Sequence, residues 1–221
     1  MTVRGWVGTF SIAVVAAAAA VSLAPQAGAA TASGQTLPHT KKVVVRPVHR
    51  DGRPVSGYTV VPENHGPTFT CTSPSPVSVD SGVAWCGSSA DATIACWKSG
   101  HHTVLCLRDP RVHKLVRIRY SGTFRAGHAL GRPEPEGLVL GNRDYCTVRI
   151  GGAWGPVAKH PTWVGYYSCG SGSAVYGPIK LRDGIDRSVD PWRVHVVSGN
   201  APDQVIHTRR VAVAYFVGTA K

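Results

Sequence analysis

Acidic residues are scarce in this sequence, and glutamate is the rarest of the charged residues. The 221 residues include 24 Lys and Arg against 12 Asp and Glu, and the only glutamates are Glu63, Glu134 and Glu136. Glycoside hydrolysis usually requires two carboxylates that flank the scissile bond. Glu134 and Glu136 are close in sequence, but each adjoins a proline in GRPEPEG, so we expect a solvated acidic turn there.

Long apolar segments are missing beyond the N-terminus. After residue 29 no apolar run reaches about 18 residues, the length that a membrane-spanning helix needs. Apolar residues at helical spacing never extend over more than about two turns. These absences exclude a permanent membrane span in the processed chain and argue against a helical domain.

Motifs of common enzymes are also absent. The chain contains no G-x-S-x-G elbow, no H-E-x-x-H and no glycine-rich phosphate loop. Ser171 and Ser173 in CGSGSA are the best serine candidates, but the glycines around them suit turns next to a cysteine. We therefore expect a non-enzymatic protein without a cofactor. A hydrolase whose Ser, His and Asp come from distant positions is the enzymatic alternative.

Patterns typical of metal sites are weak. Zinc sites made of cysteine use closely spaced pairs such as C-x2-C, and none occurs here. His101 and His102 are adjacent, so in a hairpin tip their side chains would point to opposite sides. The aspartates of LRDGIDRSVDPW suggest calcium, but the interleaved arginines and the spacing argue against a calcium loop. No metal site is predicted.

The N-terminus has the pattern of a secretory signal peptide over residues 1–29. Arg4 precedes an apolar stretch from Phe10 to Ala24, and Ala27-Gly28-Ala29 supplies the small residues of a cleavage site. The uninterrupted apolar run within that stretch is short for a permanent anchor, although an uncleaved anchor is the alternative. We expect a secreted, extracellular or cell-wall-associated protein with a flexible lead-in over residues 30–42.

An even number of cysteines in an exported chain predicts a set of disulfides. Six cysteines follow the signal peptide and predict three bonds. Apolar runs flank Ser99-Gly100-His101-His102, so a hairpin about this loop would bring Cys96 close to Cys106. Cys71–Cys86 and Cys146–Cys169 are the other pairings that we favour, although six cysteines permit fifteen arrangements.

The rest of the chain has the pattern of short strands joined by turns. The run 115–120, LVRIRY, alternates apolar and basic residues, which predicts one buried and one solvated face. VAVAYFV at 211–217 is apolar on both faces and predicts a central strand. We predict an all-β class, with antiparallel sandwich or barrel-like sheets. One domain over residues 43–221 is expected, and a sub-boundary near 131–137 is the alternative.

Basic residues are the main functional signal, because a net charge of +12 attracts anions over about 10 Å at moderate salt. An early group comprises Lys41, Lys42, Arg46, Arg50 and Arg53. A second group surrounds the strand 115–120, where alternation should place Arg117 and Arg119 on one side. We predict an anion-binding face made of Arg111, Lys114, Arg117 and Arg119. The alternative is that the charge only maintains solubility.

Several short motifs carry a resemblance. They are Cys96-Trp97, Leu105-Cys106-Leu107 with Asp109-Pro110, Gly151-Gly152-Ala153-Trp154, and Arg210-Val211 with Ala214-Tyr215-Phe216-Val217-Gly218. Through them the chain resembles small secreted disulfide-containing proteins of actinobacteria, a group with no known activity. The resemblance implies export and disulfide bonds, and it implies no activity and no site residues.

Taken from the sequence, the expected function is that of a secreted or cell-surface binding module. Its expected partner is an anionic polymer of the cell envelope or a lipid head group, because these are the abundant anions outside a bacterial cell, and nucleic acid is not expected. The alternatives are the hydrolase described above and a secreted protease inhibitor that presents the loop Ser99–His102.

Overall fold

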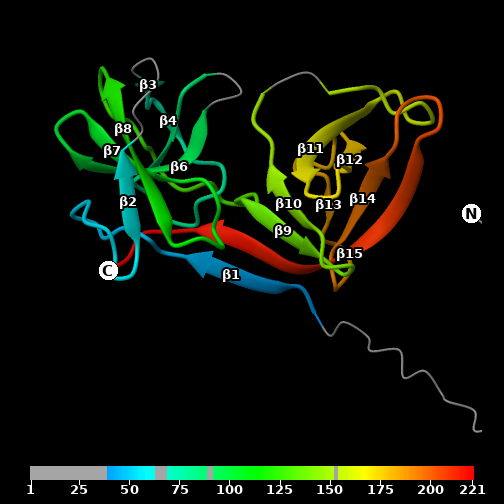
Figure 1. Cartoon of the computed structure of the whole chain (residues 1–221), viewed down its shortest axis with the longest axis horizontal. Helices are drawn as coiled ribbons and strands as arrows, with labels where there is room; N and C mark the ends of the chain where they lie inside the picture. Colours follow the sequence, from blue (N-terminus) through cyan, green and yellow to red (C-terminus); the bar gives the residue numbers. More distant parts are fainter. Residues whose placement is uncertain (1–38, 63–68, 89–91, 152–153) are drawn as a thin grey trace, which may run out of the picture. The chain divides into compact units, whose positions relative to one another are not determined.

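The computed structural model describes residues 39–62, 69–88, 92–151 and 154–221. Within these ranges the chain forms fifteen β-strands and no helix, which confirms the predicted all-β class (Figure 1). None of the described residues belongs to a helix with the length and hydropathy needed to cross a membrane. The expected signal peptide, residues 1–29, and most of the expected lead-in lie outside the described ranges.

Six strands form a closed antiparallel barrel. They are β9 (Gly137–Leu140), β10 (Tyr145–Val148), β11 (Trp163–Cys169), β12 (Ala174–Pro178), β14 (Arg193–Ser198) and β15 (Val205–Val217). Each pairs with the next, and pairing between β15 and β9 closes the ring. Leu138, Tyr167 and Val194 belong to its buried core, and the short strand β13 (Ile185–Asp186) pairs with the start of β14.

The strand β1 (Lys41–Val45) lies at a sheet edge and runs parallel to β15. The hydroxyl of Thr40 fastens its start, because it accepts a hydrogen bond from the Trp192 N–H at 2.7 Å and donates one to the Val211 carbonyl at 2.8 Å. Thr40 is buried, and β1 already begins at Lys41. The expectation that the flexible lead-in extends to residue 42 was therefore wrong at its C-terminal end.

A second sheet contains the remaining strands. They are β2 (Thr59–Pro62), β3 (Phe69–Thr70), β4 (Ser73–Pro74), β5 (Val83–Cys86), β6 (Thr93–Gly100), β7 (Thr103–Leu107) and β8 (Lys114–Ser121). The order is β2-β8-β7-β6-β5-β4, with β3 also paired to β8. Both β2 and β3 run parallel to β8, so parallel pairings add to the antiparallel pattern expected from sequence.

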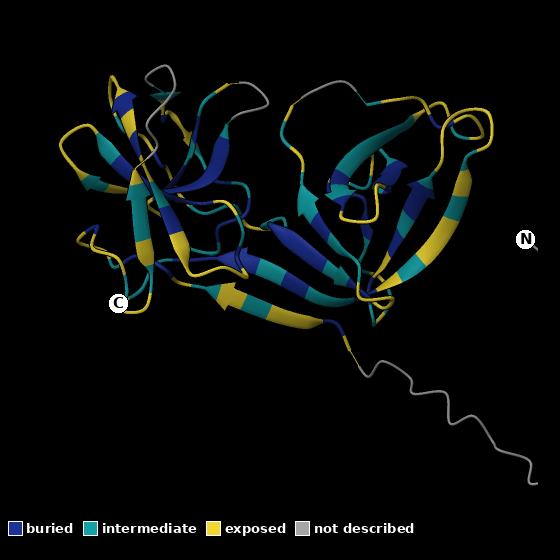
Figure 2. Cartoon of the chain, viewed as in Figure 1, coloured by how far each residue is buried: buried dark blue, intermediate teal, exposed yellow. Residues whose placement is uncertain are grey.

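The alternation in β8 matches its burial. On one face Ile118 and Tyr120 are buried and Val116 is half-buried, whereas Arg117 and Arg119 are exposed on the other, and Figure 2 shows this change of colour along the strand. Leu115, near the start of the strand, is also buried although it has the parity of the two arginines. Apolar side chains are removed from water on one face while the basic ones stay hydrated. The sequence pattern of β8 therefore determines which face of the strand packs into the core.

Three disulfides cross-link the strands. They join Cys71 to Cys86, Cys96 to Cys106 and Cys146 to Cys169. Cys96 lies directly opposite Cys106 in the β6–β7 ladder, and Cys146 lies opposite Cys169 in the β10–β11 ladder. Two of the bonds thus reinforce pairings that the backbone already makes.

The C-terminal strand belongs to the barrel and reaches the core of the second sheet. β15 pairs with β14 and β9 inside the barrel, and its last residue, Val217, packs in a separate buried cluster with Trp97, Leu105 and Leu115 of the second sheet. Val217 also bridges to Ser78. The last residues of the chain are therefore held next to the second sheet.

Candidate anion-binding pocket

A hollow of about 670 Å³ lies beside the second sheet, where four separate segments of the chain meet. It is lined by Arg46, His49, Arg50, Asp80, Ser81, Gly82, Trp97, Lys98, Thr219 and Lys221. We call these residues the cationic pocket, because its Lys and Arg side chains outnumber its one acidic side chain.

A tight turn after β1 forms one wall of the cationic pocket. The His49 N–H donates to the Arg53 carbonyl at 2.9 Å, and the Gly52 N–H donates to the His49 carbonyl at 2.9 Å. Gly52 has a φ of +83°, and a Cβ there would lie 2.8 Å from the Ser99 Cα. Glycine is thus required both by the backbone conformation and by the close approach of β6. The turn holds Arg50 near Lys98.

A partly exposed network of hydrogen bonds supports another wall of the cationic pocket. The Arg46 guanidinium donates to the Asp80 carboxylate and, at 2.9 Å, to the Thr219 carbonyl. The Thr219 N–H donates to the same carboxylate at 2.9 Å. Gly218 makes this arrangement fit, because a Cβ on it would lie 2.6 Å from the Arg46 Nη1. The Asp80 carboxylate therefore already accepts from two donors, and its negative charge mainly neutralises the positive charge of Arg46.

The last residues of the chain are fixed by two further contacts. The indole Nε1 of Trp97 donates to the Thr219 hydroxyl at 3.1 Å, and the His49 Nδ1 lies 2.9 Å from the Lys221 carbonyl oxygen. Trp97 is 2% exposed, so its ring forms a rigid floor. These contacts place Lys221 at the rim of the pocket.

Three cationic side chains of the pocket remain available to a ligand. Arg50, Lys98 and Lys221 are exposed, and the described part of the chain offers no ion pair to any of them. Each comes from a different segment, so their convergence depends on the tertiary fold. An arrangement of several hydrated cations over a structured wall suits phosphate or carboxylate groups.

The predicted anion-binding face occupies a different place. Lys114, Arg117 and Arg119 are exposed on β8, and none of them lines the cationic pocket. Arg111 is held by Asp109 through bonds of 2.8 and 3.0 Å, and its guanidinium carbon lies 3.3 Å from the centre of the Tyr145 ring. The structure therefore gives Arg111 a structural contact, while the face formed by β8 stays a prediction.

Sequence reasoning found only part of the cationic pocket. Arg46 and Arg50 were grouped because they are close in sequence, but Lys98 and Lys221 join them through β6 and through the segment after β15. The aromatic Trp97 next to Lys98 is the one local signal that marks the floor. The other residues of the pocket come from segments far apart in the chain, so no short stretch of sequence predicts that they meet.

The residues considered for hydrolysis do not assemble a catalytic triad in the described ranges. The Ser171 hydroxyl donates to the Asp144 carboxylate at 2.5 Å and lies 2.8 Å from the Ser173 hydroxyl. No hydrogen bond joins a serine hydroxyl to a histidine among the residues described. Without an imidazole to take its proton, Ser171 lacks an activating base. Its contacts instead stabilise the turn next to the Cys146–Cys169 bond.

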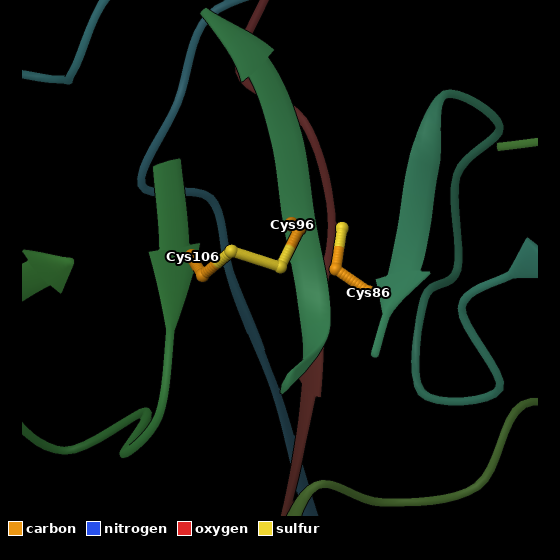
Figure 3. A group of neighbouring side chains, drawn as sticks. All are labelled: Cys86, Cys96 and Cys106. Atoms are coloured by element: carbon orange, nitrogen blue, oxygen red, sulfur yellow. A yellow bond between two sulfur atoms is a disulfide. The ribbon is translucent and has the colours of Figure 1, made fainter. Parts of the chain in front are cut away.

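The groups of possible metal ligands contain disulfide sulfurs. Cys86, Cys96 and Cys106 form one group, and Figure 3 shows the bond between Cys96 and Cys106 with Cys86 beside it. The other group combines Asp144 with the Cys146–Cys169 pair. A cysteine binds a metal ion as a thiolate, and a sulfur in a disulfide is not a thiolate. The proximity of these atoms reflects the cross-links.

The interpretation of 131–137 as a solvated acidic turn was wrong for Glu136. Its side chain is 3% exposed, and Glu134 is partly buried and pairs with Arg182 at 3.3 Å. Burial, followed by the negative charge of Asp183, raises the pKa of Glu134. The backbone explains the burial: the Glu136 N–H donates to the Tyr215 carbonyl, and its carbonyl accepts from the Val148 N–H, so the residue is part of the barrel.

The histidine pair lies at the tip of the β6–β7 hairpin. The rings of His101 and His102 meet edge to face at 4.3 Å, and His102 has a φ of 59°. The loop Ser99–His102 considered for protease inhibition is thus a short turn between two paired strands.

Comparisons with protein-family models, with curated proteins and with solved structures find no match to this chain.

Proposed function

We propose that this protein is a non-enzymatic binding module that holds phosphate or carboxylate groups of an anionic polymer in its cationic pocket. The observation that carries the proposal is the convergence of Arg50, Lys98 and Lys221 from three segments at one hollow. A polymer with repeated anionic groups gains affinity by engaging several cations at once and by releasing bound counterions.

The support beneath the pocket favours binding over simple solubility. Surface charges that only maintain solubility need no ordered scaffold. Here the backbone that carries the three available cations is held by three features. They are the turn at Gly52, the buried indole of Trp97 and the Arg46–Asp80 ion pair. Preorganised sites lose less entropy on binding, so the same charges bind more tightly than they would on a mobile surface.

We also propose that the protein acts outside the cytoplasm, as part of the same function. The support is the signal-peptide pattern of residues 1–29 together with the disulfides, which are compatible with an oxidising compartment. The expected partners there are envelope polymers that carry phosphodiesters or carboxylates. A test of export is mass spectrometry of the culture supernatant and of the isolated cell-wall fraction, where we expect a product that begins at Ala30. A product that keeps Met1 inside the cell contradicts it.

The binding proposal is tested with immobilised polymers of defined charge. The probes are poly(glycerol phosphate), poly(glutamate) and uncharged dextran, and the measurement is the dissociation constant by biolayer interferometry at several salt concentrations. We expect binding to the two polyanions, no binding to dextran, and a linear fall of the logarithm of the association constant with the logarithm of the salt concentration. Binding that does not respond to salt, or equal binding to dextran, contradicts the proposal.

A further inference from the structure

A second hollow, of about 540 Å³, contains a buried carboxyl group that has no hydrogen-bond partner on one oxygen. Its lining includes Ala92, Thr93, Ile94, Leu107, Arg108, Glu136, Thr147, Val148, Arg149, Ile150 and Ser168. We call it the Glu136 hollow. It shares no residue with the cationic pocket, so it is a separate feature of the molecule.

The position of Glu136 in this wall is fixed. Its N–H donates to the Tyr215 carbonyl at 2.7 Å, and its carbonyl accepts from the Val148 N–H at 3.0 Å. The side chain is 3% exposed, and Oε2 is buried without a partner. A buried polar atom without a hydrogen-bond partner destabilises the fold, so such atoms are rare unless a ligand or an ordered water completes them.

The charge state of Glu136 follows from its surroundings. Burial, with the nearby negative charge of Asp109 second, raises the pKa of Glu136 to about 8. The carboxyl group is therefore mostly neutral at pH 7, and it carries a proton that it can donate. The titratable and charged groups on the surrounding elements are Arg108, Asp109, Arg111, Tyr145, Arg149 and Tyr215.

The walls of the hollow combine two kinds of surface. Thr93, Thr147 and Ser168 supply hydroxyl groups, while Ile94, Leu107, Val148 and Ile150 supply apolar area. Arg108 and Arg149 also line it, and each interacts with other parts of the chain. Sites of this composition bury the apolar part of a small molecule and orient it with a few hydrogen bonds.

We propose that the Glu136 hollow binds an uncharged small organic molecule, or an uncharged unit of a larger one, that offers a hydrogen-bond acceptor to the Glu136 carboxyl group. An amide carbonyl or a sugar hydroxyl meets this requirement. A cationic ligand is disfavoured, because the carboxyl group is neutral and two arginines line the wall. The proposal does not depend on the anion-binding function, since the two hollows have no residue in common.

The test uses protein labelled with ¹⁵N and a set of small probes. The uncharged probes are acetamide, glucose and N-acetylglucosamine, and the charged probes are acetate and ethylammonium. We expect saturable shifts of the Ile94, Thr147 and Val148 amide signals with at least one uncharged probe at pH 7, and weaker binding of both charged probes. No saturable shift with any uncharged probe, which means that the hollow holds water only, overturns the proposal, and so does tighter binding of acetate.

Two variants make the role of Glu136 testable. Glu136→Gln keeps the size and a donor, so its affinity for the probe should stay close to that of the unmodified protein. Glu136→Leu removes the donor and should weaken binding about tenfold. In the unmodified protein the affinity should fall as the pH rises through about 8, whereas in Glu136→Gln it should not change. Equal pH profiles for the two proteins overturn the proposal, even if Glu136→Leu fails to fold.

Discussion

Trp97 donates a hydrogen bond from its indole nitrogen to the hydroxyl of Thr219 at 3.1 Å, across 122 residues of sequence. This bond joins the middle of the second sheet to the segment after β15. Because Thr219 also contacts Arg46 and Asp80, the floor and one wall of the cationic pocket form a single network. The geometry of the cationic pocket therefore depends on how the segment after β15 packs against the second sheet.

A double-mutant cycle measures this bond. Trp97→Phe and Thr219→Val each remove one partner and should each lower the free energy of unfolding, with about 1 kcal/mol of the loss due to the bond itself. The double variant should lose less than the sum, because the bond is removed only once. The measurement is urea unfolding followed by circular dichroism. Strictly additive losses show that the bond contributes nothing.

The close packing at Gly218 gives a second prediction. Gly218→Ala would place a methyl group against the Asp80 carboxylate and 2.6 Å from the Arg46 Nη1, so the ion pair has to move. The displaced atoms are the ends of flexible, partly exposed side chains, so we expect a loss of about 1 kcal/mol or less in the free energy of unfolding. Gly131→Ala is the matched control, because no atom lies within 4 Å of a Cβ at that position. A control that is destabilised as much as Gly218→Ala contradicts the packing argument.

The disulfides should supply a large part of the stability. Replacing both Cys146 and Cys169 by alanine opens a loop with a sequence separation of 23 residues and should lower the free energy of unfolding by about 3 kcal/mol. Guanidinium unfolding measures the loss. Peptide mapping of the non-reduced protein checks the premise, since it should detect the three linked pairs. Free thiols at these cysteines, or an unchanged unfolding midpoint in the variant, contradict the account.

The buried carboxyl group predicts a pH-dependent stability difference. The pKa of Glu136 is about 8 in the folded state and near its ordinary value of 4.5 in the unfolded state, so the unfolded chain releases the proton first. Folding therefore becomes less favourable as the pH rises from about 4.5 to about 8, by up to roughly 5 kcal/mol.

Glu136→Gln has no proton to lose, and the comparison isolates this effect. Relative to the unmodified protein, the variant should gain stability between about pH 5 and pH 9 and then reach a plateau. Thermal unfolding across this range provides the measurement, with Glu134→Gln as a less buried control. A stability difference that does not change with pH shows that Glu136 is ionised in the folded protein.

Local patterns predicted the strands that are stabilised locally. The β6–β7 hairpin follows from two apolar runs around a polar tip, and a hairpin of this kind requires Cys96 to lie opposite Cys106. The burial of β8 follows from alternation within eight residues. In both cases the information lies within a short window of sequence.

Pairings between distant segments were not predictable in the same way. Parallel pairing of β1 with β15 joins positions such as Val43 and Tyr215, and no local feature of either strand specifies its partner. Glu136 adjoins a proline in a charged turn, yet backbone bonds to Tyr215 and Val148 draw it into the barrel. The cationic pocket has the same origin, because Lys98 and Lys221 meet only through tertiary packing.

The most direct test of the account compares two triple variants that remove the same amount of charge. One variant replaces Arg50, Lys98 and Lys221 by glutamine in the cationic pocket, and the other replaces Lys114, Arg117 and Arg119 on β8. The measurement is the dissociation constant for poly(glycerol phosphate) at one fixed moderate salt concentration. We predict that the pocket variant loses about tenfold or more in affinity, whereas the β8 variant changes by less than about threefold. Equal losses in the two variants, or a larger loss in the β8 variant, contradict the assignment of binding to the pocket.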